Sequence, residues 1–511
     1  MASIPIVDRA RAYVERRAVI DDAGEYTFAE LLERSAFVAR RLLIAAQDLA
    51  EARVAFMVPP SMQHVVVQWG IWRAGGVAVP LCLQHPPPEL EYTIDDSQSS
   101  IVIAHPDFAD CLRPIAESRG LRLLTVAELD AGPVDAGRVD AGRVDDVARL
   151  PKIDVSRRAM LLYTSGTTNK PKGAVTTHEI ITAQIQSLVE AWEWTENDHI
   201  LHLLPLHHLH GILNVTCCAM WSGATCEFLP RFDADRVWDR IAVSDSLTLF
   251  MAVPTIYSRL TRAWEEANEE RQRAMSEGCR RLRLMVSGSA ALPVPTLEKW
   301  RELSGHTLLE RYGMTEIGMG LSNPLHGQRQ PGCVGAPLPG VELRLVDEAN
   351  RPVSDGAAGQ IQVRGPTVFT EYWGKSAATT EAFTDDGWFK TGDVAQREDG
   401  VYRILGRESV DIIKTGGYKV SALEIEDVLR THEQIDECAV VGVADEEWGQ
   451  RVAVAAVITP EADLKLEDLR AWCKQQLAAY KVPSLMKTVD ALPRNPMGKV
   501  TKPDVVELFE S

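Results

Sequence analysis

Hydroxyl and ammonium side chains are concentrated between residues 164 and 173, and their types suit a phosphate ligand. Four hydroxyl residues and one glycine occupy consecutive positions, namely Thr164, Ser165, Gly166, Thr167 and Thr168. Lys170 and Lys172 follow, so the segment offers hydroxyls, ammonium groups and backbone N–H groups to a phosphate chain. It differs from the P-loop of nucleoside triphosphatases, because Pro171 stands where that motif has its second glycine. A Ser/Thr-rich surface loop is the alternative interpretation of this segment alone.

A second group of chemically useful side chains lies in Glu310–Glu316, which reads Glu-Arg-Tyr-Gly-Met-Thr-Glu. The ring of Tyr312 could stack on an adenine base, and the Thr315 hydroxyl could bond a phosphate. Glu316 is a hard oxygen ligand of the kind that Mg²⁺ uses together with substrate phosphates. We expect this segment to follow a short strand at Leu308–Leu309, and taken alone it could equally be a charged turn.

Three further segments carry less specific signals. The small residues of Ser287–Leu292 let the backbone approach a flat ligand, and Asp393 could accept two ribose hydroxyls. His207, His208 and His210 form a histidine group without the ligand spacing of a zinc site. Ordinary turns and structural histidines are the alternative interpretations.

The order of these segments, followed by Gly416–Glu426 and Pro493–Lys499, resembles the AMP-forming adenylating superfamily over residues from about 27 to 500. That family includes acyl-CoA synthetases, carrier-protein adenylation domains and luciferases. Asn169 stands where its phosphate loop usually has Gly, and Asn tolerates a left-handed backbone next best. The resemblance implies that the chain uses ATP, Mg²⁺ and CoA.

The resemblance also implies a role for each motif. The implied catalytic residues are Lys499, His208, Thr315 and Glu316, and Glu316 also holds the metal. The implied ATP- and AMP-binding residues are Thr164, Ser165, Gly166, Thr167, Thr168, Lys172, Ser289, Ala290, Glu310, Arg311, Tyr312, Gly313, Asp393 and Arg407. The implied acyl pocket consists of His208, His210, Gly288 and Met314. The implied CoA-binding residues are Gly416, Gly417, Tyr418 and Trp448.

The elements that must position these residues form an α/β pattern with a break near residue 406. Predicted strands lie at 53–58, 76–80, 159–163, 247–253, 282–286, 360–364, 401–405, 438–443 and 452–458. Predicted helices begin at capping boxes formed by Thr27 with Glu30 and by Ser421 with Glu424, and a third covers 466–477. The Asp-Ala-Gly-Arg-Val repeats in 131–146 predict a surface connection.

We therefore expect a large, multi-layered N-terminal α/β domain over residues 1–406, which binds ATP and the acid. A hinge at 407–411 follows, and the backbone is expected to rotate at Ser409, Val410 or Asp411. A small, mobile α+β domain over 412–511 is expected to carry the catalytic lysine and the thioester-forming face. One small domain with two functional faces requires such a swivel.

Composition narrows the class of protein. The 511 residues carry a net charge of −18, which argues against binding to nucleic acid or to an anionic membrane. The nine cysteines form no C-x-x-C pair and indicate reduced thiols in the cytoplasm. No apolar run approaches a membrane span. We expect a monomer or a homodimer.

The expected activity is the conversion of a carboxylic acid and ATP into acyl-AMP and pyrophosphate, followed by transfer to CoA. The resemblance is strongest to malonyl- and methylmalonyl-CoA synthetases, although a specialised larger acid remains open. A dicarboxylate needs a pocket cation, for which Arg283, Lys299 and protonated His210 are candidates. Two alternatives are delivery to a carrier protein instead of CoA and a catalytically silent nucleotide-binding protein.

Overall fold

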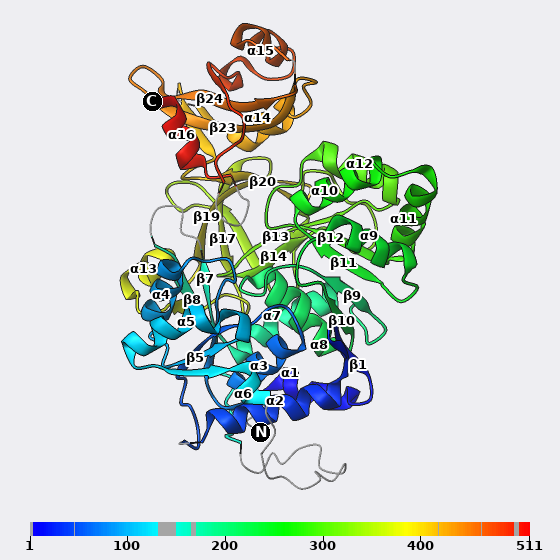
Figure 1. Ribbon diagram of the computed structural model, residues 1–511. Helices are drawn as coiled ribbons and strands as arrows, with labels where there is room; N and C mark the ends of the chain where they lie inside the picture. Colours follow the sequence, from blue (N-terminus) through cyan, green and yellow to red (C-terminus); the bar gives the residue numbers. More distant parts are fainter. Residues whose placement is uncertain are drawn as a thin grey trace.

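The computed structural model describes residues 4–44, 46–130, 150–164, 170–416, 418–460, 462–494 and 500–510. The repeats in 131–146, most of the predicted phosphate loop (165–169), Gly417 and Lys499 lie outside these residues. Figure 1 shows a large body with a smaller C-terminal part above it, and the two ends of the chain at opposite ends of the molecule. The predicted α/β class is confirmed.

A seven-stranded sheet includes, at one side, the two strands that flank the predicted phosphate loop. We call these two strands the phosphate-loop hairpin. The order of the sheet is β18 (Glu371–Tyr372), β8 (Lys172–Thr177), β7 (Arg158–Thr164), β4 (Val77–Pro80), β3 (Arg53–Met57), β5 (Ile101–Ala104) and β6 (Arg122–Thr125). The strands from β7 to β6 are parallel, whereas β8 and β18 are antiparallel additions. The segment that precedes β18 is therefore brought beside the phosphate-loop hairpin, although almost two hundred residues of chain separate them.

A nine-stranded sheet carries the other nucleotide motifs. Its order is β15 (Ala336–Pro337), β14 (Gly318–Ser322), β13 (Leu309–Met314), β12 (Leu284–Ser287), β11 (Leu249–Ala252), β9 (His199–His202), β10 (Thr225–Phe228), β1 (Arg17–Asp21) and β2 (Gly24–Thr27). The strands from β13 to β1 are parallel, and antiparallel strands complete both edges.

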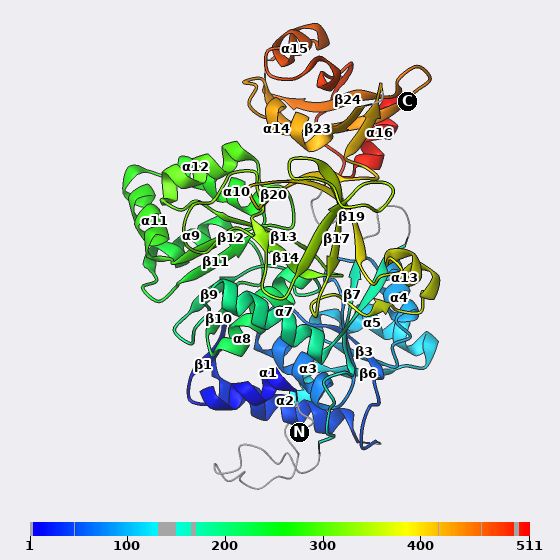
Figure 2. The ribbon, with the colours of Figure 1, turned by 180° about the vertical axis from the view of Figure 1, so that it is seen from behind.

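Helices cover these two sheets, and the largest apolar core lies between the sheets and several of the helices. They are α1 (Pro5–Ala10), α2 (Phe28–Leu42), α3 (Met62–Arg73), α4 (Pro87–Asp96), α5 (Pro106–Arg119), α6 (Val126–Asp130), α7 (His178–Ala191), α8 (Cys218–Ser222), α9 (Ala234–Val243), α10 (Pro254–Glu265), α11 (Glu269–Arg281), α12 (Val294–Ser304) and α13 (Ser376–Ala382). Figures 1 and 2 show α9–α12 gathered beside β11 and β12, where a second apolar cluster lies.

Two further sheets meet where the chain passes from the body to the C-terminal part. An antiparallel meander consists of β16 (Glu342–Val346), β17 (Ala358–Arg364), β19 (Phe389–Glu398) and β20 (Val401–Arg407). The last sheet comprises β21 (Ile412–Thr415), β22 (Tyr418–Ser421), β23 (Ile435–Asp445), β24 (Gly449–Ile458) and β25 (Leu485–Thr488). Its helices are α14 (Ala422–Leu429), α15 (Leu466–Cys473) and α16 (Lys502–Glu510), and its core clusters are its own.

Local signals in the sequence are confirmed in part. Thr27 and Glu30 form the predicted capping box of α2. Ser421 accepts the N–H of Glu424 at the start of α14, but the Glu424 carboxylate binds Lys481 instead of completing a second box. The prediction for α15 was too long, because the regular helix ends at Cys473.

The prediction that a short strand precedes Glu310–Glu316 was wrong. Strand β13 runs through the motif to Met314, and only Thr315–Ile317 form the turn into β14. A single sequence gave no sign of this extension, since the polar motif lacks an alternating apolar pattern, and pairing with β12 and β14 maintains the strand.

Candidate active site

The turn after β13, the segment before β18 and the β7–β8 hairpin lie side by side. The backbone N–H of Phe369 donates a 2.7 Å hydrogen bond to the carbonyl of Glu316. Tyr372 pairs with Ala174 across β18 and β8. Thr164 and Lys172 are cross-strand partners at the base of the predicted phosphate loop. The phosphate-loop hairpin and Glu316 therefore belong to one site.

Tyr372 contacts both Lys172, a predicted phosphate ligand, and Glu316, the predicted metal ligand. Its hydroxyl donates a 2.8 Å hydrogen bond to Oε1 of Glu316, and Nζ of Lys172 lies 4.3 Å from the centroid of its ring. Glu316 is buried, and burial raises the pKa of its carboxyl group even though Tyr372 and nearby cations oppose the shift. We missed Tyr372 because a lone Tyr in Glu-Tyr-Trp has no chemical signature in a single sequence.

The donor set at Glu316 fits a magnesium ion that is shared with phosphates. Within the described parts of the chain, no group of three or more His, Cys, Asp or Glu side chains is placed to hold a metal. Mg²⁺ usually takes only one or two protein carboxylates and completes its shell with water and substrate phosphates. A buried carboxylate with a raised pKa also gains from a nearby cation, because the cation favours its charged form.

The predicted ribose ligands are held together by a hydrogen-bonded group. Tyr312 donates a 2.6 Å hydrogen bond to Oδ2 of Asp393, and Nε of Arg407 donates to Oδ1 at 3.0 Å. Asp393 and Arg407 are cross-strand partners in β19 and β20. Asp393 is buried, so the two donors fix its carboxylate in a single orientation.

Arg311 lies beside Gly288 and His210, which we expected in the acyl pocket, and beside Ser289, which we expected to bind the nucleotide. Its Nη2 donates to Oγ of Ser289 at 3.2 Å, and this oxygen lies 3.3 Å from Nδ1 of His210. A Cβ on Gly288 would stand 2.4 Å from Nε of Arg311, so only glycine leaves room for the guanidinium. Ser289 adopts a φ of 71°, an unfavourable conformation of the kind that clusters at functional sites.

The guanidinium of Arg311 is buried, and no described residue supplies a counter-ion for it. Only 5% of the residue is exposed, and no carboxylate among the described residues pairs with it. Its Nε and the Nε2 of His210 are buried atoms without a hydrogen-bond partner in the described structure. Burial lowers the pKa of Arg311 to about 9, so the group remains charged at neutral pH.

The sequence suggested three cations that could bind the second carboxylate of a dicarboxylic acid. None of the three is placed to do so. Arg283 is bound to Asp198 at 2.7 Å, and Lys299 is half-exposed and bound to Glu265 at 3.0 Å. Burial, together with Arg311, holds the pKa of His210 well below its ordinary value, so this imidazole is neutral. The expectation of a protonated His210 was therefore wrong, because the adjacent guanidinium already supplies the charge.

The remaining predicted residues of the body lie around this group. His208 is half-buried, with its ring 4.0 Å from that of His207. Glu310 accepts the N–H of Gly332, and burial raises the pKa of Glu310 to about 8. Gly313, Met314 and Thr315 are half-buried at the end of β13, and Ala290 is exposed after β12.

The predicted CoA-binding residues lie on the C-terminal part. Gly416 donates its N–H to the carbonyl of Trp448, and its φ of 55° together with the indole 2.9 Å from a hypothetical Cβ disfavours any side chain there. Tyr418 stacks on Tyr480 with ring centroids 4.2 Å apart. Tyr418 and Trp448 are about half exposed, as residues for a large ligand should be.

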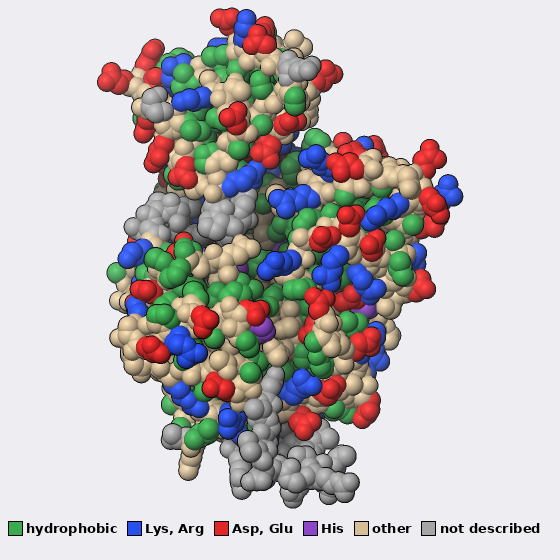
Figure 3. Space-filling model, viewed as in Figure 1, with side chains coloured by type: hydrophobic (Ala, Val, Ile, Leu, Met, Phe, Trp, Pro, Cys, Tyr) green, Lys and Arg blue, Asp and Glu red, His purple; other side chains and the backbone are tan. Residues whose placement is uncertain are grey.

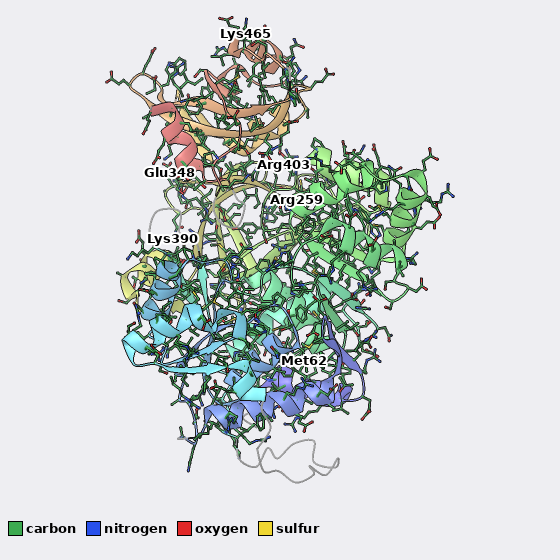
Figure 4. The ribbon with its side chains drawn as sticks, viewed as in Figure 1. Met62, Arg259, Glu348, Lys390, Arg403 and Lys465 are labelled. Carbon is green, nitrogen blue, oxygen red and sulfur yellow. The ribbon has the colours of Figure 1, made fainter. Side chains whose placement is uncertain are left out.

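A groove separates the C-terminal part from the lobe formed by α10 and α12. Figure 3 shows Lys and Arg side chains on both sides of this groove. Figure 4 labels Arg259 of α10 and Arg403 of β20 there, and Glu348 at the same junction. Glu348 forms a 2.7 Å ion pair with Lys419 of the C-terminal part.

Comparison with known proteins identifies relatives along the whole chain. The family model "AMP-binding enzyme" matches residues 6–373, and the model of the C-terminal domain of such enzymes matches residues 424–499. The mitochondrial malonate–CoA ligase ACSF3 of Xenopus laevis is 44% identical, with 99% of this chain and 92% of that protein covered. The described helices include none that is both long and apolar enough to cross a bilayer.

Two solved structures are informative about the arrangement of the parts. The ATP-bound MatB of Rhodopseudomonas palustris has a TM-score of 0.89 at 33% identity, with 99% of each chain covered. A malonyl-CoA ligase in a ternary product complex with methylmalonyl-CoA and AMP has a TM-score of only 0.68 at 35% identity, with 96% of this chain and 100% of that chain covered. Sequence identity therefore does not explain the difference in structural similarity.

Proposed function

The chain belongs to the family of AMP-binding enzymes, and from this premise we propose that it is a malonate–CoA ligase. It is an AMP-forming acyl-CoA synthetase that uses ATP, Mg²⁺ and CoA. An oxygen of the acid's carboxylate attacks the α-phosphorus of ATP, and pyrophosphate leaves. The CoA sulfur then attacks the acyl carbon, and AMP leaves.

The observation that supports malonate is the buried guanidinium of Arg311, with which no carboxylate in the described part of the chain pairs. A dicarboxylate carries a second negative charge into the acyl pocket, and burying that charge without a partner is very costly. A guanidinium binds a carboxylate through two parallel hydrogen bonds. Gly288 leaves the space for this group, and Ser289 and His210 offer further polar contacts beside it.

We therefore reassign Arg311 from the nucleotide ligands to the acyl pocket. Its neighbour in β13, Tyr312, contacts Asp393 and so remains with the nucleotide. Successive side chains of a strand point to opposite faces, so one strand can serve both substrates. Arg311 and Tyr312 would thereby place the acid close to the α-phosphate.

We extend the proposal to the roles of the nucleotide ligands. Asp393 and Arg407 bind the ribose, and Lys172 and Thr315 contact the phosphates. Mg²⁺, held by Glu316, would neutralise phosphate charge. Lys499 approaches the α-phosphate during adenylation, where an ammonium stabilises the charge that develops as the carboxylate attacks.

We propose that residues 407–411 are a hinge between a body at 1–406 and a small domain at 412–511. Strand β20, which ends at Arg407, belongs to the meander of the body, and β21, which begins at Ile412, belongs to the separate C-terminal sheet. The higher similarity to an ATP-bound relative than to a product complex supports a rotation between the half-reactions.

After that rotation, the surface that contains Gly416, Tyr418 and Trp448 presents CoA to the acyl-AMP. We call this surface the Gly416–Trp448 face. The exposed rings of Tyr418 and Trp448 offer flat surfaces, and Arg259 and Arg403 offer positive charge near the groove (Figures 3 and 4). A local positive patch on a chain of net charge −18 favours an anionic acceptor such as CoA.

We infer a reducing compartment and an assembly no larger than a dimer. All nine cysteines are free, which supports a reducing compartment such as the expected cytoplasm. The vertebrate relatives are named as mitochondrial. Cell fractionation tests the compartment. Light scattering tests the assembly, for which we expect the mass of a monomer or a homodimer.

A pyrophosphate-release assay against a panel of mono- and dicarboxylic acids tests the proposal. We expect malonate to give the highest kcat/KM, with malonyl-CoA formed only when CoA is present. Preference for a large monocarboxylic acid would contradict the substrate assignment. Thioester formation on an acyl carrier protein but not on CoA would favour the carrier-protein alternative.

A further inference from the structure

Lys502 is a buried cation next to the segment that carries Lys499. It begins α16, and only 12% of its side chain is exposed. Its Nζ lies 2.7 Å from Oδ1 of Asp411 and 2.8 Å from Oε1 of Glu426. One ammonium group therefore joins the start of the C-terminal helix to two carboxylates from distant parts of the sequence.

Two backbone contacts join the chain on either side of the Lys499 segment, directly before Lys502. Arg494 and Val500 form an antiparallel bridge on either side of residues 495–499. The N–H of Thr501 donates a 3.0 Å hydrogen bond to the carbonyl of Pro493, directly before Lys502. The residues on both sides of this short segment therefore lie next to the start of α16.

Asp411, at the other end of the ion pair, belongs to the proposed hinge. Its Oδ2 accepts the N–H of Arg407 at 2.9 Å, and its own N–H donates to the carbonyl of Arg407 at 2.8 Å. Arg407 in turn binds Asp393, the proposed ribose ligand, at 3.0 Å. A continuous series of contacts thus runs from Lys502 through the hinge to the nucleotide site.

Glu426 binds the same ammonium group as Asp411 does, but Glu426 lies outside the proposed hinge. It lies in α14, and its carboxylate also accepts the N–H of Val440 and binds Arg430. All of these partners belong to the C-terminal part. The contact between Lys502 and Glu426 therefore stabilises that part without reaching the hinge.

On the basis of the proposed function, we propose that Lys502 is a positioning residue whose ion pair with Asp411 stabilises the adenylation arrangement of the two domains. A turn of the backbone within 407–411 moves Lys502 and Glu426 together with the small domain, whereas Arg407 stays with the body. The Asp411 carboxylate cannot then keep both Arg407 and Lys502. The pair therefore favours the present arrangement, which is closer to the ATP-bound relative than to the product complex.

Paired variants of the two carboxylates test this role. Asp411→Asn removes the charge at the hinge but keeps an oxygen for the Arg407 N–H, and Glu426→Gln removes the other partner of the same lysine. The rate of acyl-AMP formation and the rate of thioester formation from supplied acyl-AMP are measured separately in the full chain. We expect Asp411→Asn to lower the ratio of the first rate to the second about tenfold and Glu426→Gln to leave the ratio unchanged.

Variants of the lysine itself complete the experiment. Lys502→Met should change the ratio as Asp411→Asn does, and Lys502→Arg, which retains the charge, should restore it. Lys465→Met is the surface control, because Lys465 is exposed at the far end of the small domain (Figure 4). If Lys502→Met does not fold, the comparison of Asp411→Asn with Glu426→Gln is sufficient to test whether Lys502 acts through Asp411.

Equal ratios in Asp411→Asn and Glu426→Gln would overturn the inference, because Lys502 would then act only on stability. This failure differs from a failure of the proposed function. In the latter case the unsubstituted chain would release no pyrophosphate with malonate, and the ratio would be measured with whichever acid the panel identifies.

Discussion

The hydroxyl group of Tyr312 donates a 2.6 Å hydrogen bond to Oδ2 of Asp393, and this bond joins the nine-stranded sheet to the four-stranded meander. Arg407 holds the other carboxylate oxygen from the adjacent strand. The proposed ribose ligand is therefore oriented before the nucleotide arrives, and little side-chain entropy is lost on binding.

Replacement of Asp393 by Asn should weaken ATP binding. A neutral amide cannot accept from Tyr312, Arg407 and ribose hydroxyls together, and hydrogen bonds to charged groups contribute ~1.5–3 kcal/mol each. We expect the KM for ATP to rise by about ten- to a hundredfold, with the KM for malonate unchanged. A parallel rise in both constants would indicate general damage to the site instead.

Replacement of Arg311 by Met should remove the preference for a dicarboxylate. The second carboxylate of malonate would then enter a pocket without a cation, and we expect kcat/KM for malonate to fall at least about a hundredfold. Activity with a short monocarboxylic acid should be retained or increase. Lys299→Met is the matched control, since Lys299 binds Glu265 near the surface and should not affect either substrate. Retention of malonate activity in Arg311→Met would refute the assignment.

Replacement of Lys499 by Ala should separate the two half-reactions. Loss of an electrostatic group that acts on the transition state typically costs ~3–4 kcal/mol, so adenylation should slow by about a hundred- to a thousandfold. Thioester formation from supplied acyl-AMP should continue, because the lysine has withdrawn at that stage. Quench-flow measurement of each half-reaction checks this expectation, and an equal loss of both would contradict it.

Replacement of Gly417 by Leu should have the opposite effect. A branched side chain beside Gly416 would stand on the Gly416–Trp448 face, which we propose presents CoA, and would block the path of its pantetheine arm. We expect pyrophosphate release in a single turnover to persist while malonyl-CoA formation drops at least tenfold, about 1.4 kcal/mol in the barrier. Normal thioester formation in this variant would disprove the location of the path.

Glu310 should make the stability of the protein fall as the pH rises between 4.5 and about 8. Burial raises the pKa of Glu310 from 4.5 to about 8, so the folded chain keeps a proton that the unfolded chain has released. The free energy of unfolding must then fall as the pH rises from 4.5 to about 8. Glu310→Gln lacks this dependence, and its Tm should fall less than that of the unsubstituted chain between about pH 6.5 and 8, above the ordinary pKa of histidine. Parallel Tm curves would show that Glu310 is not protonated in the fold.

The sequence alone determined the chemistry of this protein, because that chemistry depends on residue types in a fixed order. The hydroxyl-rich segment, Glu310–Glu316, Asp393 and the Lys499 segment identified an adenylating enzyme. The α/β class and the capping box at Thr27 were also predictable, since apolar runs and local hydrogen bonds leave signals in neighbouring residues.

Tertiary structure decided which side chains meet. Sequence spacing could not place Tyr372 between Lys172 and Glu316, because β18 joins β8 only through sheet pairing. It also could not show that Arg283 is neutralised by Asp198, whereas none of the carboxylates that the structure describes pairs with Arg311. Whether a buried charge is free for a substrate depends on its three-dimensional neighbours, and these come from strands that are far apart along the chain.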